Sequence, residues 1–125
     1  MPSPEQVRAA VDAYIDAYNR DDRDAFLAAF AGDGVIVDPV GTPAHEGVEA
    51  RGGFWDSVHG LAERLELVPK DVIVCADEAV MVFSIHATSG GSTTVIDAVD
   101  VFRVDDDGRI LTMRAYWDLS RAHPA

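Results

Sequence analysis

Apolar residues in the first quarter of the chain recur with helical spacing. Ser3 and Gln6 fit a capping box, and Pro4 fits the first helical position. The positions that follow predict an amphipathic helix of at least four turns, with an apolar face of Val7, Ala10, Val11, Tyr14, Ile15 and Tyr18. Asp22 is expected to cap a second helix, which ends at residues 32–34 and has an apolar face of Phe26, Leu27, Ala29 and Phe30.

The next segments predict a short strand and a third helix. Residues 35–37 form an apolar run that ends at Asp38, because the residue before a proline is pushed into an extended conformation. Residues 41–47 are expected to be a loop. Residues 48–61 are expected to be a helix, since their apolar side chains fall on one stripe: Phe54, Trp55, Val58 and Leu61.

The second half of the chain has the pattern of β-strands. Residues 65–68 and 72–74 predict one long strand bent at residues 69–71, followed by strands at 79–88, 93–104 and 109–117. Residues 89–92 and 105–108 predict the turns between them. The tail, residues 118–125, is expected to be irregular.

Helices followed by an antiparallel meander predict an α+β fold. A curved sheet with helices on one face forms a cone, whose apolar interior suits one small hydrophobic ligand. No repeat, linker or low-complexity segment interrupts residues 1–125, so we expect a single domain.

Two carboxylates lie within the apolar strand at residues 95–102. Strict alternation places Asp100 on one face with Ile96, Ala98 and Phe102, and Asp97 on the other face with valines. A carboxyl group among apolar neighbours should remain neutral, because burial disfavours the charged form. A neutral carboxylic acid is a hydrogen-bond donor, so Asp100, with Asp97 as the alternative, is a functional candidate.

Composition narrows the possible partners. Hydrophobic residues make up 48% of the 125 residues, which is enough for a core. The net charge of −12, with Lys70 as the one lysine, argues against nucleic acids and anionic membranes as partners. No apolar run approaches the roughly 18 residues of a membrane span. The first five residues also lack a charged and hydrophobic leader, so we expect a cytoplasmic protein.

Three polar side chains stand out against apolar surroundings: Tyr14, Asp38 and Asp100. Together with segments 37–43, 99–103 and 107–117, they resemble the bacterial ketosteroid isomerases of the nuclear-transport-factor-2-like superfamily, which includes SnoaL-like proteins. The resemblance covers nearly the whole chain. It implies the cone-shaped fold of that superfamily, with helices packed on a curved antiparallel or mixed sheet. It also implies a steroid Δ-isomerase that transfers a proton within a Δ5-3-ketosteroid.

The resemblance implies one role for each of the three catalytic candidates. Asp38 matches the general base, which moves a proton between C4 and C6. Tyr14 and Asp100 match the two donors to the C3 oxygen, with Asp100 protonated. Trp117 matches a pocket tryptophan whose N–H could bond Asp38. The expected walls of the steroid site are Phe83, Met81, Trp55, Phe54, Val40 and Phe30.

The sequence departs from the family where tyrosines support the donor tyrosine in some members. Phe30 and Trp55 occupy those positions; Phe30 cannot hydrogen-bond, and Trp55 can only donate. The chemistry needs no cofactor. The four histidines are scattered, so no metal site is expected. The family also implies a homodimer formed through the sheet face that carries Asp97.

Two other readings remain open at this point. One is a SnoaL-like polyketide cyclase, which would use acid–base groups in the same cone. The other is a non-catalytic binder of a small hydrophobic molecule, although an apolar binding pocket gains nothing from an ionised Asp38 in its wall.

Overall fold

Two N-terminal helices form at the predicted caps. In the computed structural model, which describes residues 1–125, α1 (Pro4–Asn19) is capped by Ser3, and α2 (Arg23–Ala28) by Asp22. The Ser3 hydroxyl accepts from the backbone N–H of Gln6 at 3.2 Å, and the Gln6 side chain accepts from the backbone N–H of Ser3 at 2.8 Å. The predicted capping box is therefore confirmed.

The strand β1 (Phe30–Val37) begins earlier than predicted, and α2 is correspondingly shorter. Phe30 is not on the apolar face of α2; it starts β1, opposite Ile110 of a strand that the sequence pattern alone did not connect to it. The pairing is irregular between Phe30 and Val35. Gly34 is required here, because a Cβ atom would lie 2.9 Å from the carbonyl oxygens of Ala31 and Ile110.

A buried arginine anchors this part of β1. Arg51 is 1% exposed, and its guanidinium donates to the carbonyl oxygen of Gly34 at 2.7 Å. The guanidinium also lies over the Phe30 ring, 5.3 Å from the ring centroid. Arg51 comes from α3 (Gly47–His59), close to the predicted helix. A two-residue strand, β2 (His45–Glu46), lies in the segment predicted as a loop and pairs with β1.

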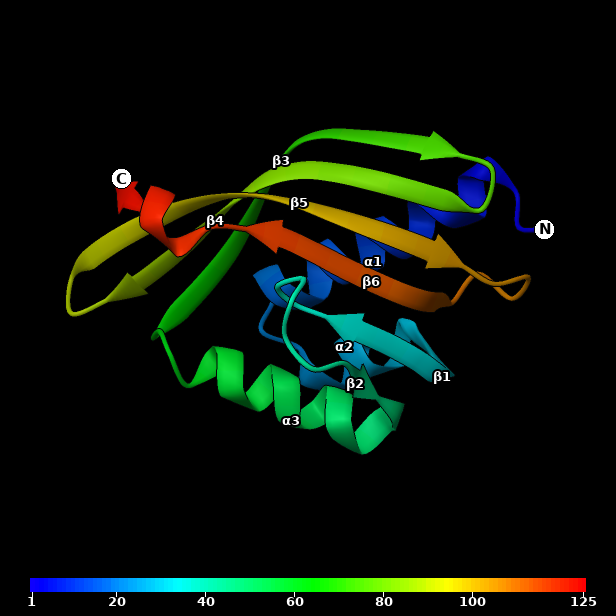
Figure 1. The fold of residues 1–125 in the computed structure, drawn as a ribbon, viewed down its shortest axis with the longest axis horizontal. Helices are drawn as coiled ribbons and strands as arrows, with labels where there is room; N and C mark the ends of the chain where they lie inside the picture. The colour runs from blue at the N-terminus through cyan, green and yellow to red at the C-terminus, as the bar shows by residue number, and fades with distance from the viewer.

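Four long strands form the rest of the sheet: β3 (Arg64–Cys75), β4 (Glu78–Ser89), β5 (Ser92–Val104) and β6 (Ile110–Trp117). The order across the sheet is β2-β1-β6-β5-β4-β3, with β3 to β6 antiparallel and β1 parallel to β6. Figure 1 shows the long strands bowed across the molecule. The sheet is therefore mixed, and the predicted bend in β3 coincides with a register shift between Pro69 and Asp71.

The tail is ordered, contrary to the prediction. Residues Leu119–Arg121 form a 3-10 turn, η1, and β7 (His123–Pro124) pairs with β5 beside Thr94 and Val95. The tail therefore adds a short strand to the sheet beside β5. No helix is both long and apolar enough to cross a membrane.

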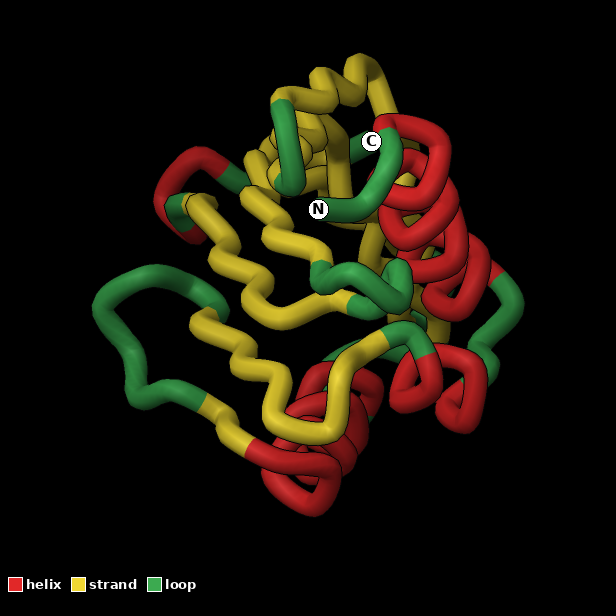
Figure 2. The backbone as a smooth tube through the Cα atoms, turned by 90° about the vertical axis from the view of Figure 1, so that its right-hand side faces the viewer, coloured by secondary structure: helices red, strands yellow, loops and turns green.

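The helices and the inner face of the sheet enclose the core, as the α+β pattern predicts. Figure 2 shows α1 and α3 on one side of the curved strands. A cluster of 22 buried residues joins the two layers, including Phe26 of α2, Met81 of β4 and Phe102 of β5. Tyr14 is a member of this cluster, and Asp100 is one of the few polar residues that are also buried.

Candidate active site

A cavity of about 550 Å³ lies between the helices and the inner face of the sheet. Fifteen of its 20 lining residues are hydrophobic. Its main polar groups are two phenols, Tyr14 and Tyr18, two carboxyl groups, Asp38 and Asp100, and the imidazole of His45. An apolar cavity with a few convergent polar groups is the usual form of a small-molecule site.

Asp100 faces this cavity from β5. The alternation predicted for the strand is confirmed, since Ala98, Asp100 and Phe102 are buried. Asp100 is 2% exposed. Burial raises the pKa of its carboxyl group well above the ordinary value, and the charge of Asp38 raises that pKa further. No hydrogen-bond donor opposes these effects, so the environment favours the protonated, donating form.

Asp97 lies on the opposite face and has the opposite environment. Its carboxylate accepts from Lys70 Nζ at 2.9 Å and from the Ser84 hydroxyl at 2.9 Å. These hydrogen bonds and the charge of Lys70 lower the pKa of Asp97. The expectation that valine neighbours would keep Asp97 neutral is therefore wrong, because the side chain reaches a cation and a hydroxyl at the surface.

Asp38 follows the last residue of β1 and is half-buried. The indole N–H of Trp117 donates to Asp38 Oδ1 at 2.7 Å, as predicted. Burial raises the pKa of Asp38 above its ordinary value, and the Trp117 hydrogen bond and the nearby imidazole of His45 offset part of that rise. Asp38 therefore has two partners that favour its ionised form, whereas Asp100 has none.

Tyr14 enters the cavity from α1 and is 2% exposed. Burial raises the pKa of its phenol well above the ordinary value, and Tyr18, Asp100 and Asp38 raise it further. Tyr14 consequently remains protonated and can donate a hydrogen bond.

The backbone of three adjacent strands brings the two carboxyl groups together. Ala115 of β6 pairs with Asp100 of β5. The carbonyl oxygen of Ala115 also accepts from the backbone N–H of Val40, at 2.9 Å. Ala115 thus lies between Asp100 and the turn that carries Asp38. Since α1 covers the same region, the structure places Tyr14, Asp38 and Asp100 in one cavity.

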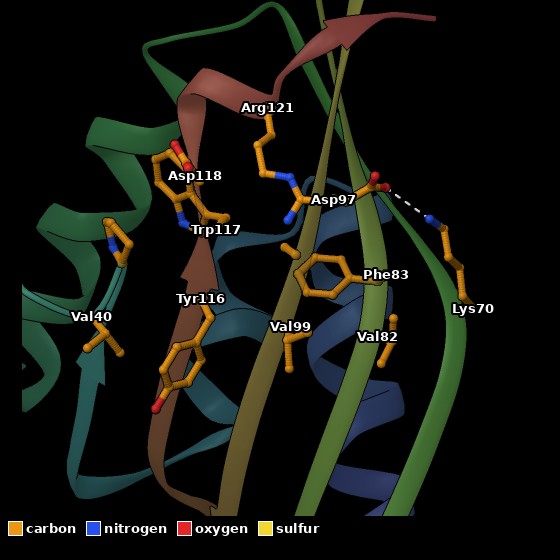
Figure 3. Close-up of a pocket in the computed structure, with 12 residues that line it drawn as sticks. Val40, Lys70, Val82, Phe83, Asp97, Val99, Tyr116, Trp117, Asp118 and Arg121 are labelled. Carbon is orange, nitrogen blue, oxygen red and sulfur yellow. Dashed lines mark hydrogen bonds and ion pairs between the residues drawn. The ribbon is translucent and has the colours of Figure 1, made fainter.

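Three of the seven predicted substrate contacts line the cavity: Trp117, Phe83 and Phe54. The other four do not. Met81 is fully buried in the core, Trp55 packs behind Tyr18, and Phe30 packs against Phe26 and Tyr14. Val40 is 39% exposed and lines a separate hollow beside Tyr116 and Val99, shown in Figure 3.

Tyr18 and His45 also line the cavity, although neither was predicted to belong to the site. Tyr18 follows Tyr14 by one helical turn, and this i, i+4 spacing was the signal that could have identified it. His45 belongs to β2, opposite Ile36, and its ring centroid lies 5.2 Å from that of Phe54. Its place depends on the unpredicted pairing of β2 with β1, so no local pattern indicated it.

The side chains of this cavity have the chemistry that proton transfer requires. One carboxylate can accept a proton, and a phenol and a carboxylic acid can donate hydrogen bonds to a developing oxyanion. No group of three or more His, Cys, Asp or Glu side chains is arranged to hold a metal ion.

Comparisons with known proteins find similarity along most of the chain. The SnoaL-like domain model matches residues 11–113. A protein named steroid Delta-isomerase from Nocardioides simplex is 33% identical over 112 residues, covering 90% of this chain and 89% of that protein.

Two solved structures resemble the whole fold. The epoxide hydrolase/cyclase-like enzyme SalBIII, described in pyran ring formation in the polyether salinomycin, has a TM-score of 0.89 at 25% identity, with 100% of both chains covered. The Delta 5-3-ketosteroid isomerase from Mycobacterium sp. has a TM-score of 0.84 at 25% identity, covering 96% of this chain and 98% of that one.

Proposed function

We propose that this chain, which belongs to the SnoaL-like domain family, is an isomerase that moves the C5=C6 double bond of a Δ5-3-ketosteroid into conjugation. One observation carries the proposal: two carboxyl groups in the same apolar cavity have different environments. Asp38 has a 2.7 Å donor in Trp117, and Asp100 is buried without one. This division of labour between two carboxyl groups is already established for ketosteroid isomerases.

The proton transfer begins at Asp38. Its carboxylate takes a proton from C4, and the electrons of that C–H bond form a C3=C4 bond as the C3 oxygen becomes negatively charged. The oxygen then re-forms its double bond, C4=C5 forms, and the electrons of C5=C6 take the proton at C6. Asp38 returns to its ionised form, so no atom or electron is gained or lost. A positioned carboxylate of this kind is a general base.

Tyr14 and Asp100 stabilise the charge on the C3 oxygen. Both side chains line the cavity, and burial favours the protonated form of both. Each donor is expected to lower the barrier by about 3 kcal/mol, as judged from the loss of one oxyanion donor elsewhere. The rings of Trp117, Phe83 and Phe54 supply apolar surface for the steroid. The reaction involves no net oxidation, so the proposal includes no cofactor.

The test is a direct assay with 5-androstene-3,17-dione, followed by the ultraviolet absorbance of the conjugated enone. We expect rapid growth of absorbance that the Asp38→Asn substitution abolishes. Asparagine has nearly the same shape, so a folded variant isolates the loss of the base. Absorbance that grows no faster than in buffer, or equally fast in the variant, would contradict the proposal.

A cyclase acting on a polyketide-like substrate is the second candidate. The full-length similarity to SalBIII favours it, and it would use the same acid–base groups. Steroid that binds tightly without turnover would instead indicate a non-catalytic binder. A protein that neither binds nor converts steroids would favour the cyclase.

We also propose that the chain forms a homodimer through the outer face of the sheet. Apolar side chains are exposed there, including Ile73 at 56%, Tyr116 at 45% and Val82 at 37%. Tyr116 and Val82 border the hollow in Figure 3, beside the Lys70–Asp97 ion pair. Sedimentation analysis of the protein and of Val82→Glu tests this, with a shift to monomer expected for the variant.

A further inference from the structure

The second phenol of the cavity, Tyr18, has no role in the reaction described so far. It lies on α1 one turn after Tyr14, is 5% exposed, and lines the same cavity. The two ring centroids are 5.1 Å apart. The closeness of the two hydroxyl groups raises the pKa of Tyr14 and acts to lower the pKa of Tyr18, as when Tyr14 donates to Tyr18.

Aromatic rings hold Tyr18 from behind. Its centroid lies 4.9 Å from that of Trp55 and 5.5 Å from that of His59, and Phe26 meets it at a 90° interplanar angle. The His59 ring is stacked 3.8 Å from Trp55 and bonded through Nδ1 to the Trp55 carbonyl oxygen at 2.9 Å. The Tyr18 ring therefore has little freedom to turn its hydroxyl away from Tyr14.

Tyr14 has few other candidates for a supporting donor. Phe30, whose centroid is 6.3 Å from that of Tyr14, has no polar atom. Phe26 and Phe102, at 5.8 and 5.1 Å, have none either. Among the aromatic rings packed on Tyr14, Tyr18 alone carries a hydroxyl.

From this arrangement we infer that Tyr18 is a positioning residue: when Tyr14 donates its hydrogen bond to the substrate oxyanion, the Tyr18 hydroxyl turns to donate to the phenol oxygen of Tyr14, and so orients and strengthens Tyr14 as a donor. The inference rests on the proposed function only where it is tested by the steroid assay. A phenol that donates one hydrogen bond while accepting another is a stronger donor, because the two bonds polarise each other.

The steroid assay compares three tyrosine-to-phenylalanine variants. Tyr18→Phe keeps the ring and should lower kcat about tenfold while KM changes less than twofold. Tyr14→Phe should lower kcat by about a hundredfold or more, as for the loss of an oxyanion donor. Tyr116→Phe is the matched control: it removes a phenol hydroxyl outside the cavity and keeps the apolar ring that the proposed dimer face needs, so it should match the wild type in kcat and in sedimentation.

The double variant Tyr14→Phe/Tyr18→Phe separates positioning from direct contact. If Tyr18 acts through Tyr14, the double variant is no slower than Tyr14→Phe alone. Losses that multiply would overturn the inference, because Tyr18 would then act on the substrate by itself. A Tyr18→Phe variant with unchanged kcat, or with a change in KM alone, would overturn it as well.

Binding of 4-nitrophenol tests the same inference without any turnover. A bound nitrophenolate mimics the charged oxygen, and its visible absorbance reports the ionised fraction. We expect Tyr18→Phe to lower that fraction several-fold and Tyr116→Phe to leave it unchanged. If the steroid assay fails for the wild type and this pattern still appears, the proposed reaction is wrong and the role of Tyr18 stands. An ionised fraction that is equal in wild type and Tyr18→Phe overturns the role itself.

Discussion

Trp117 and Asp38 are 79 residues apart in the chain, yet the indole nitrogen of one lies 2.7 Å from the carboxylate of the other. The parallel pairing of β1 with β6 produces this contact, because it places the ends of the two strands side by side. The donated bond lowers the pKa of Asp38 against the effect of burial. Trp117 is thus both a wall of the cavity and a partner of the proposed base.

The Trp117→Phe variant should shift the pH dependence of the reaction. Asp38 accepts a proton only when it is ionised, so kcat/KM rises with pH through the pKa of Asp38. Removing the N–H raises that pKa and moves the acid limb to higher pH. We therefore expect a larger loss of kcat/KM at pH 5 than at pH 8. A loss of the same factor at every pH would assign Trp117 to packing alone.

Substitutions at Asp100 should show whether the reaction depends on the size of this side chain or on its ability to donate a hydrogen bond. Asp100→Leu has a similar size and no donor, and should lower kcat by about a hundredfold or more. Asp100→Asn retains an N–H donor, so its kcat should fall only about tenfold. Asp97→Asn, three residues away in the same strand on the exposed face, is the control and should keep full activity. Equal losses in the leucine and asparagine variants would contradict a donor role.

The burial of Asp100 should also make stability depend on pH. The pKa of this carboxyl group is raised in the native protein. Between the ordinary carboxyl pKa and that raised value, the unfolded chain has lost its proton and the native protein has kept it, so stability falls as pH rises. Asp100→Asn removes this effect. Its melting temperature should exceed that of the wild type by a few degrees at pH 8, corresponding to about 1 kcal/mol, and by less at pH 4. An advantage that does not grow with pH would contradict the raised pKa.

Asn19 joins the end of α1 to β3 through two hydrogen bonds. Its amide donates to the Leu67 carbonyl oxygen at 3.0 Å and accepts from the Leu67 N–H at 2.8 Å. Asn19→Ala should therefore lower the free energy of unfolding by about 2 kcal/mol, measured by urea denaturation. Because α1 carries Tyr14 and Tyr18, kcat should fall as well. Asp12→Ala, on the exposed face of the same helix, should change neither quantity appreciably.

Much of the fold followed from local patterns. The capping residues Ser3 and Asp22 predicted both helix starts, and alternation predicted the long strands. The early start of β1 at Phe30 was missed, because this segment is extended by its pairing with β6, about 80 residues later. The two-residue strands β2 and β7 were missed for the same reason: neighbours distant in the sequence define them, and no periodicity of their own does.

For the candidate site, the polar residues were predicted better than the apolar residues of the cavity wall. Alternation in β5 separated Asp100 from Asp97, but only the positions of Lys70 and Ser84 explain why Asp97 differs in pKa. The resemblance pointed to Tyr14 and Asp38, and their roles remain proposals. Four residues that were expected to line the cavity do not line it: Met81, Trp55, Phe30 and Val40. The packing of one ring behind another, as Trp55 behind Tyr18, depends on three-dimensional contacts that a sequence pattern does not contain.

The hydrogen-bonded ladder β1-β6-β5 fixes both carboxyl groups, whereas different segments form the outer rim of the cavity. Leu61, in the connection after α3, and Leu119, in η1, are 82% and 66% exposed and line the cavity from outside that ladder. Replacing them would reshape the entrance without moving Asp38 or Asp100. Such a layout would allow a lineage to acquire new substrates by altering its rim while it inherits the proposed proton-transfer groups intact.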